Sequence, residues 1–139
     1  ASAGTTFVQR DHKGSRRAAR LALVERVQAG GRAALFPEGT TSAAPGCLAF
    51  HPGMFHASAS AGFSVQPVAV HYPDTAVPYV DDDHLLSHFL TLFRRRAVRV
   101  HVVWGPVLTA GCGVELKQQA EDWVRASLEA LQRLDPVAG

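Results

Sequence analysis

The sequence predicts one α/β domain, with a mostly parallel sheet flanked by helices. Segments rich in β-branched and aromatic residues alternate along the chain with segments that repeat apolar residues every three to four positions. Strands that alternate with helices favour parallel pairing through helical crossovers. The chain has 139 residues, 47% hydrophobic and 19% charged, as is typical of a globular domain. We therefore expect residues 1–139 to form a single domain.

The first two predicted elements are a strand and a helix. Residues 5–8 carry β-branched and aromatic side chains, and a polar turn follows them. Residues 15–29 then repeat apolar side chains at helical spacing. We expect Ser15 to be the N-cap of this helix and Gly30 and Gly31 to end it.

The third predicted element is a short apolar strand, residues 33–36, which we expect to be buried. Pro37 interrupts this strand, and residues 38–46 follow as a loop at its carboxyl end. Loops at that end of a strand are where α/β proteins place their sites. After the loop, residues 53–61 favour a short helix. Residues 65–71 favour a strand in which Pro67 indicates an edge position or a bulge.

The last part of the chain predicts a helix, a strand and a helix. Residues 85–93 form an apolar stripe that Asp83 can cap, and the three arginines at 94–96 suit the helix C-terminus. These arginines could instead contact anionic lipid headgroups. Residues 98–104 alternate as a strand. A final amphipathic helix is predicted by Leu116, Ala120, Trp123, Val124, Ser127 and Leu131.

Composition argues against several other classes of protein. Cys47 and Cys112 lie far apart and form no C-x-x-C pair, so a zinc site or disulfide framework lacks support. No apolar run approaches the ~18 to 20 residues of a spanning helix. The net charge of +2 is too small to indicate a nucleic-acid partner.

Two pairs of histidines have spacings compatible with metal binding. They are His51 with His56, and His84 with His88. No third Cys, His or carboxylate is obviously placed to complete either site, so we expect no metal.

The loop after residues 33–36 is the segment with the most chemistry. It presents a carboxylate, a glycine and three hydroxyls in succession: Glu38, Gly39, Thr40, Thr41 and Ser42. The glycine allows close approach of a ligand to the backbone, and the hydroxyls could hold a phosphate or an alcohol. The carboxylate suits a glycerol-like hydroxyl or a nearby arginine. The alternative is a turn whose Ser and Thr satisfy only the local backbone.

Arg10 lies directly after the first predicted strand. In a parallel sheet it would emerge at the same sheet end as Glu38, and its guanidinium matches phosphate oxygens in a bidentate fashion. The alternative is a surface arginine paired with Asp11 or with solvent.

Several blocks of residues match a known family in order and spacing. They are Phe7-Val8-Gln9-Arg10, then Phe36-Pro37-Glu38-Gly39-Thr40-Thr41-Ser42, then Leu48, Phe50, Gly53 and Phe55, and then Val65-Gln66-Pro67-Val68-Ala69-Val70. Together they resemble the second, third and fourth blocks of the glycerolipid acyltransferases, of the bacterial 1-acylglycerol-3-phosphate and lyso-ornithine-lipid acyltransferase type.

This resemblance implies transfer of a fatty acyl group from acyl-CoA or acyl carrier protein to the free hydroxyl of a lysolipid. The expected reaction converts 1-acylglycerol-3-phosphate to phosphatidic acid in phospholipid biosynthesis. The expected partners are the lysolipid, the thioester donor and a membrane surface, with no cofactor beyond the donor. The expected location is peripheral, on the cytoplasmic face of the bacterial inner membrane.

The resemblance also implies roles for individual residues. Arg10 would clamp the anionic headgroup, Glu38 would hold the glycerol side, and Pro67 would shape the site. Gly39, Thr40, Thr41 and Ser42 match the other acceptor-binding positions. The family often has Arg where this chain has Thr41 and Lys where it has His51. The loss of these cations keeps a lyso-ornithine acceptor open.

The family's catalytic pair, a His followed by four residues and an Asp, is absent from the sequence. In the family this His is the general base on the acceptor hydroxyl, oriented by the Asp. We therefore expect no catalytic residue in this chain, which would be a C-terminal portion incomplete at its N-terminus. Two alternatives stay open: a non-catalytic lipid- or phosphate-binding module, and an α/β domain whose turns only imitate the blocks.

Overall fold

The computed structural model describes residues 13–40, 46–74 and 93–135. In chain order the elements are α1 (Lys13–Gln28), α2 (Gly53–Ser60), β1 (Val68–His71), β2 (His101–Trp104) and α4 (Gly113–Leu134). The strand predicted over residues 5–8 and nearly all of the helix predicted over 85–93 lie outside the described residues. The extent of the domain, residues 1–139, stays a prediction.

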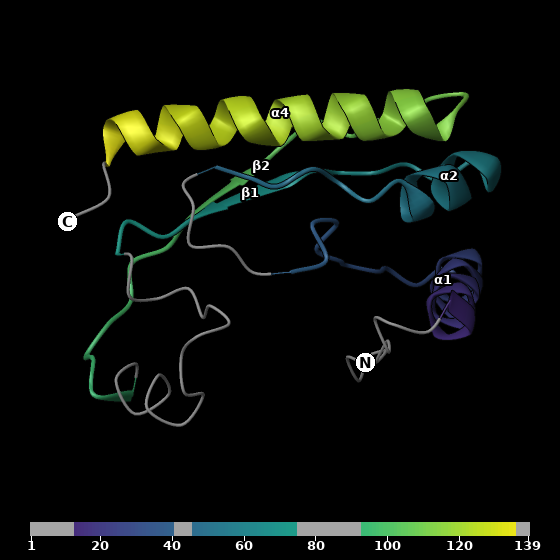
Figure 1. The fold of residues 1–139 in the computed structure, drawn as a ribbon, viewed down its shortest axis with the longest axis horizontal. Coiled ribbons are helices and arrows are strands. Elements are labelled where there is room, and N and C mark those ends of the chain that lie inside the picture. Colours follow the sequence, from purple (N-terminus) through teal and green to yellow (C-terminus); the bar gives the residue numbers. More distant parts are fainter. Residues whose placement is uncertain (1–12, 41–45, 75–92, 136–139) are drawn as a thin grey trace.

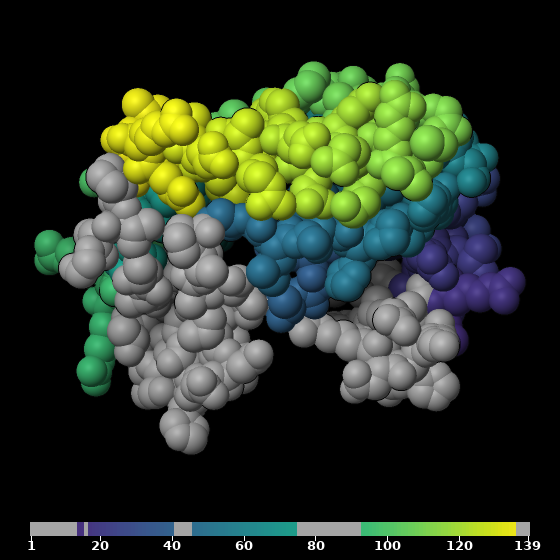
Figure 2. All heavy atoms as spheres, turned by 45° about the horizontal axis from the view of Figure 1, so that its top comes forward, coloured from purple at the N-terminus to yellow at the C-terminus, as the bar shows by residue number. Residues whose placement is uncertain are grey.

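The long helix α4 packs along one face of the sheet formed by β1 and β2, and α2 lies beside its first turns (Figure 1). α1 contacts α2 but is more peripheral. The core lies between α4, α2 and β1, and consists of Phe50, Phe55, Ala69, Leu116, Ala120, Val124 and Leu128. The apolar stripe predicted for the last helix is thus confirmed at its buried positions. In the space-filling view, α4 forms a continuous ridge over the blue and teal segments (Figure 2).

Helix α1 ends at Gly30 and Gly31, as the sequence predicts. Gly30 has a φ of +81°, its N–H bonds to the Val27 carbonyl at 3.0 Å, and the Gly31 N–H bonds to the Arg26 carbonyl at 3.0 Å. This is the Schellman pattern, in which a left-handed residue lets the chain satisfy the last carbonyls of the helix. The same pattern ends α2 at Gly62, whose φ is +70°.

The beginning of α1 differs from the prediction. The helix begins at Lys13, so Ser15 lies within its first turn and is not the N-cap. The N–H groups of a first helical turn have no partner within the helix, and a serine hydroxyl suits this turn as well as the cap. Residue type alone therefore did not locate the first residue of the helix.

The two strands pair antiparallel, not parallel as predicted. Val68 lies opposite Trp104 and His71 lies opposite His101. Alternation of side chains specifies which residues share a face of a strand, but it is the same for both directions of pairing. In the described part of the chain the sheet has these two strands alone, so a mostly parallel sheet is not what these residues form.

A bulge lies beside Pro67, as the sequence predicts. Val65 forms an isolated antiparallel bridge with Leu108, and the next pair along the ladder is Val68 with Trp104. Two residues separate the first members of these pairs, and three separate the second members, so the second strand carries one extra residue. Gly105 lies in the bulge and donates its N–H to the Pro67 carbonyl at 2.9 Å.

Residues 33–36 are not a buried strand. They have no regular secondary structure, and Phe36 is 84% exposed. An apolar run becomes a buried strand only where another strand pairs with it, and no strand in the described ranges does so. The prediction was therefore wrong for these residues as the structure describes them.

The face of the sheet turned away from α4 remains partly uncovered. The cross-strand pairs on this face are Val68 with Trp104 and Val70 with Val102, and Trp104 is 68% exposed. On the opposite face, Ala69 and His71 of β1 are buried, whereas Val103 of β2 is 36% exposed. Within the described ranges, no helix is long and apolar enough to cross a bilayer.

Candidate functional site

The predicted acceptor loop begins with a tight turn. The Gly39 N–H donates to the Phe36 carbonyl at 3.2 Å, and Gly39 has a φ of +70°, in the left-handed region that favours glycine. A Cβ atom on Gly39 would lie 3.0 Å from Cδ2 of His51. Glycine is thus required here both by the backbone and by the imidazole beside it.

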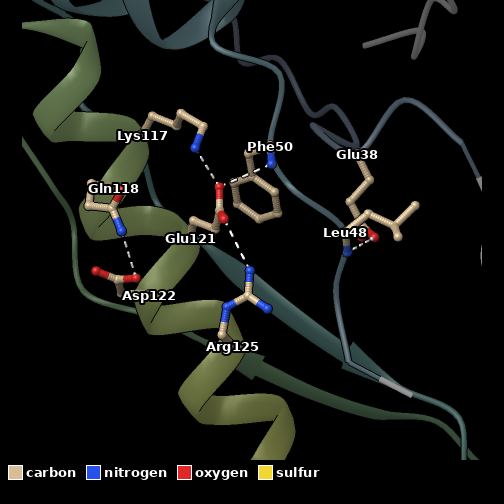
Figure 3. Close-up of polar contacts among 8 residues, drawn as sticks. All are labelled: Glu38, Leu48, Phe50, Lys117, Gln118, Glu121, Asp122 and Arg125. Atoms are coloured by element: carbon tan, nitrogen blue, oxygen red, sulfur yellow. Dashed lines mark hydrogen bonds and ion pairs between the residues drawn. The ribbon is translucent and has the colours of Figure 1, made fainter. Parts of the chain in front are cut away.

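Glu38 ties the two ends of the loop together. Its Oε2 accepts a hydrogen bond of 2.7 Å from the Leu48 N–H, ten residues along the chain (Figure 3). The Pro37 carbonyl accepts a second bond, of 2.8 Å, from the His51 N–H. The structure therefore places Glu38 and Gly39 directly against residues 48–51. One oxygen of the Glu38 carboxylate serves the backbone.

The segment after the loop is anchored in turn to α4. The Phe50 N–H donates to Glu121 Oε2 at 3.0 Å. The Phe50 ring is buried and stacks on Phe55, with 5.9 Å between ring centroids and 11° between ring planes. The backbone of residue 50 is thus held by a carboxylate on α4, while its ring is held in the core.

Glu121 is a buried carboxylate with three donors. Its residue is 8% exposed, and besides the Phe50 N–H it accepts from Lys117 Nζ at 2.7 Å and from Arg125 NH2 at 3.1 Å (Figure 3). The hydrogen bond from Lys117 is the main cause that lowers the pKa of the Glu121 carboxyl, against the opposing effect of burial. The group is therefore ionised at neutral pH.

Cys47, just before Leu48, is not an activated nucleophile. Burial raises the pKa of its thiol, and the negative charges of Glu38 and Glu121 act in the same direction. Arg125 opposes them. Thiols react as thiolates, so this environment disfavours covalent chemistry at Cys47.

Pro67 lies in a different set of contacts from the loop. A Cβ atom on Gly105 would lie 2.8 Å from Pro67 Cγ and 2.9 Å from the Trp123 ring. Gly105 therefore packs closely against both Pro67 and Trp123 of α4, with no room for a side chain of its own. Among the other predicted acceptor-binding residues, Glu38, Gly39 and Thr40 are described and lie in one loop. Arg10, Thr41 and Ser42 lie outside the described residues.

A second polar cluster, which sequence reasoning missed, joins the far end of the sheet to the end of α4. Asp135 Oδ2 accepts from His101 Nε2 at 2.8 Å and from Arg99 at 3.2 Å. The buried His71 lies 3.0 Å from the Asp135 carbonyl through its Nε2. The His101 hydrogen bond is the main cause that lowers the pKa of the Asp135 carboxyl. No sequence signal links residues so far apart.

Two other features of the surface bear on binding. A shallow groove of about 290 Å³ lies between α1 and α2 and is lined by Arg17, Arg20 and His56, among others. Of the arginines at 94–96, Arg95 forms an ion pair with Asp74. Over the ranges that the structure covers, no group of three or more Cys, His, Asp or Glu is placed to hold a metal ion.

Fold and site together define a domain in which a carboxylate-bearing loop is fastened to a helix that covers a small sheet. The family model described as "Acyltransferase" matches residues 1–71, about half of the chain. The chain belongs to the acyltransferase family. Glu121, which sequence reasoning also missed, lies well beyond the matched part.

Relatives with assigned activities match nearly the whole chain. The lyso-ornithine lipid O-acyltransferase of Pseudomonas aeruginosa is 36% identical over 133 residues, which cover 91% of this chain and 51% of that protein. The 1-acyl-sn-glycerol-3-phosphate acyltransferases of Neisseria meningitidis and Neisseria gonorrhoeae are 29% and 34% identical, with 90% of this chain and 52% of each relative covered. The chain spans about half the length of these relatives. No solved structure matches significantly.

Proposed function

We propose that this chain carries the acceptor-binding part of an enzyme that transfers a fatty acyl group from a thioester to the hydroxyl of a lysolipid. The observation that carries the proposal is the fastening of the Glu38 loop, which lies in the family-matched half, to residues 48–51. These bonds fix Glu38 and Gly39 against residues 48–51 before any ligand binds, which lowers the entropic cost of binding a flexible lipid there.

Different residues of the loop would contact different parts of the lysolipid acceptor. Gly39 leaves the backbone open to close approach, and the Thr40 hydroxyl supplies a polar contact. Glu38, with Oε2 on the Leu48 N–H, keeps the loop in shape and offers its other oxygen to an acceptor hydroxyl. Arg10 would clamp an anionic headgroup. Thr41 and Ser42 would complete the loop, and Pro67 would shape the site indirectly, through its close contact with Gly105.

Both lyso-ornithine lipid and 1-acylglycerol-3-phosphate are candidate acceptors. The resemblance to the family implies 1-acylglycerol-3-phosphate first. Lyso-ornithine lipid is favoured by the 36% identity to the Pseudomonas aeruginosa enzyme. It is also favoured by an imidazole, His51, packed against Gly39 at a position where the family often has a lysine. The headgroup of ornithine lipid carries an ammonium group beside its carboxylate, so it needs less cationic help than a phosphate does.

The donor would be acyl-CoA or acyl carrier protein, with no further cofactor. The enzyme would act as a peripheral protein on the cytoplasmic face of the bacterial inner membrane, where lysolipid acceptors reside. The sequence holds no His followed by four residues and an Asp. The proposal therefore assigns the general base to no residue of this chain.

The test is acyl transfer by the full-length product of the gene that encodes this chain. Purified protein would be given each thioester donor with lyso-ornithine lipid or with 1-acylglycerol-3-phosphate in detergent micelles, and the diacyl product would be measured by mass spectrometry. We expect transfer to at least one acceptor and a KM for that acceptor about tenfold higher in Glu38→Ala, through loss of a charge-assisted hydrogen bond.

The matched control is Glu129→Ala, which removes an exposed carboxylate of α4 whose ion pair with Arg133 is 3.8 Å long. This variant should behave as the wild type. Binding of a lysolipid without turnover would favour the alternative of a non-catalytic lipid-binding module. Absence of both binding and transfer would overturn the proposal.

A further inference from the structure

We propose that Glu121 is the positioning residue of the acceptor loop: from α4 it holds the segment of residues 46–51 to which Glu38 and Gly39 are tied. The inference rests on the function proposed for that loop and assigns its geometry to a residue outside the family-matched part of the chain.

The contacts form a short relay from helix to loop. Glu121 Oε2 holds the Phe50 N–H at 3.0 Å, and two residues earlier the Leu48 N–H holds Glu38 Oε2 at 2.7 Å. The next residue, His51, bonds to the Pro37 carbonyl at 2.8 Å. Glu121 therefore restrains the backbone at Phe50, which lies between the two residues, Leu48 and His51, whose N–H groups hold Glu38 and Pro37. Figure 3 shows the carboxylate of Glu121 bonded to the Phe50 amide of this segment and the carboxylate of Glu38 bonded to its Leu48 amide.

The charges around Glu121 show why a carboxylate can hold this position. A buried carboxylate is costly unless it is paired and hydrogen-bonded. Lys117 and Arg125 lie one turn before and one turn after it, at 2.7 and 3.1 Å. Among the described residues, the bond that the carboxylate forms outside its own helix is the one to the Phe50 N–H. The bond is thus charge-assisted and stronger than a neutral one.

The packing of α4 on the sheet does not depend on this bond. Leu116, Ala120 and Val124 fill the core from the same helix and contact β1 and α2 through apolar atoms. The loss of the Glu121 side chain would free the Phe50 backbone while these contacts persist. If Glu121 served only to attach α4 to the core, it would not need to bind the Phe50 N–H beside the acceptor loop.

The experiment compares Glu121→Ala, Glu121→Gln and the control Glu129→Ala in the full-length gene product. Two quantities are measured: the KM for the lysolipid against kcat and the donor KM, and the hydrogen-exchange rates of the Leu48 and Phe50 amides. In Glu121→Ala we expect an acceptor KM about tenfold higher with the donor KM unchanged, and faster exchange at both amides by a similar factor.

Glu121→Gln retains an oxygen that can accept from Phe50, so its values should lie between those of the wild type and Glu121→Ala. Glu129→Ala should match the wild type, because its carboxylate is exposed. The glutamine variant also serves if the alanine variant does not fold. The inference would be overturned if Glu121→Ala kept both the wild-type exchange rate at Leu48 and the wild-type acceptor KM. If only Glu121→Gln folds, the same result in that variant would overturn it.

The two proposals fail in different ways. If the wild-type protein transfers no acyl group to any lysolipid, the proposed function fails, but exchange at Leu48 still reports whether Glu121 positions the loop. If transfer occurs and exchange at Leu48 is unaffected by Glu121→Ala, the positioning role fails while the function stands.

Discussion

Gly113, the first residue of α4, lies directly against the backbone of His56 in α2. A Cβ atom on Gly113 would be 2.4 Å from the His56 Cα atom and 2.6 Å from its backbone nitrogen. Backbone atoms within a helix cannot yield as the end of a flexible side chain does. The close approach of α4 to α2 therefore depends on the absence of a side chain at residue 113.

The first prediction follows from this contact. Gly113→Ala should lower the free energy of unfolding by about 1–3 kcal/mol, because the added methyl group forces the two helices apart. The matched control is Gly111→Ala, where a Cβ atom would meet no heavy atom within 4 Å. Urea unfolding of both variants measures the effect. Equal stability of the two variants would contradict the packing described here.

The second prediction concerns the centre of the core. Leu116 is fully buried between α4, α2 and β1. Leu116→Ala should cost about 3 kcal/mol, from the lost transfer energy and the cavity left behind. Val114→Ala, on the same helix, removes a side chain that is 63% exposed and should change stability by less than about 0.5 kcal/mol. Thermal unfolding of the pair would show a difference in Tm.

The third prediction is a pH dependence. The hydrogen bond from Lys117 lowers the pKa of Glu121 from its ordinary value of 4.5. A carboxyl with a lowered pKa in the folded state contributes stability that is complete above 4.5 and is lost as the pH falls through the lowered value. The wild type should therefore lose more stability below pH 4.5 than Glu121→Gln does. Parallel acid dependences would indicate that Glu121 does not contribute.

The fourth prediction compares the two cysteines. Burial raises the pKa of the Cys47 thiol, whereas Cys112 is exposed. Iodoacetamide at pH 8 should therefore label Cys112 first, and Cys47 should react about tenfold more slowly in the folded protein. Mass spectrometry of timed samples gives both rates. In denaturant the difference should disappear, and its persistence there would point to a cause other than the fold.

Local signals predicted local features well. The glycine pair Gly30 and Gly31 marked the end of α1, because a left-handed residue closes the helix with two hydrogen bonds. Pro67 marked a bulge, since proline cannot donate to a ladder. The stripe through Leu116, Ala120 and Val124 marked the buried face of α4.

Features that depend on distant parts of the chain were not predictable in the same way. The direction in which β1 and β2 pair depends on how the chain returns between them, and alternation does not carry that information. The exposure of Phe36 depends on its neighbours in space. Glu121 follows a buried Ala120 and lies on the polar side of the stripe, and its partner Phe50 is 71 residues away.

The same distinction between local and distant signals applies to the candidate site. The Glu38 loop was recognisable from its residue types and from its resemblance to the acyltransferases. The bond from Leu48 to Glu38, which gives the carboxylate a role in the shape of the loop, was not. Residue identity indicates which groups are available for chemistry, while the fold decides how many of their hydrogen bonds are already taken.

The position of α4 determines where this chain can be truncated. A fragment cut at residue 71, where the family match stops, would keep Phe50 and Ala69 but lose every core side chain that α4 contributes. It would also leave the Phe50 amide without its acceptor. Such a fragment would retain the Glu38 loop but expose the apolar core residues that α4 covers. The shortest fragment worth expressing therefore extends through Leu134.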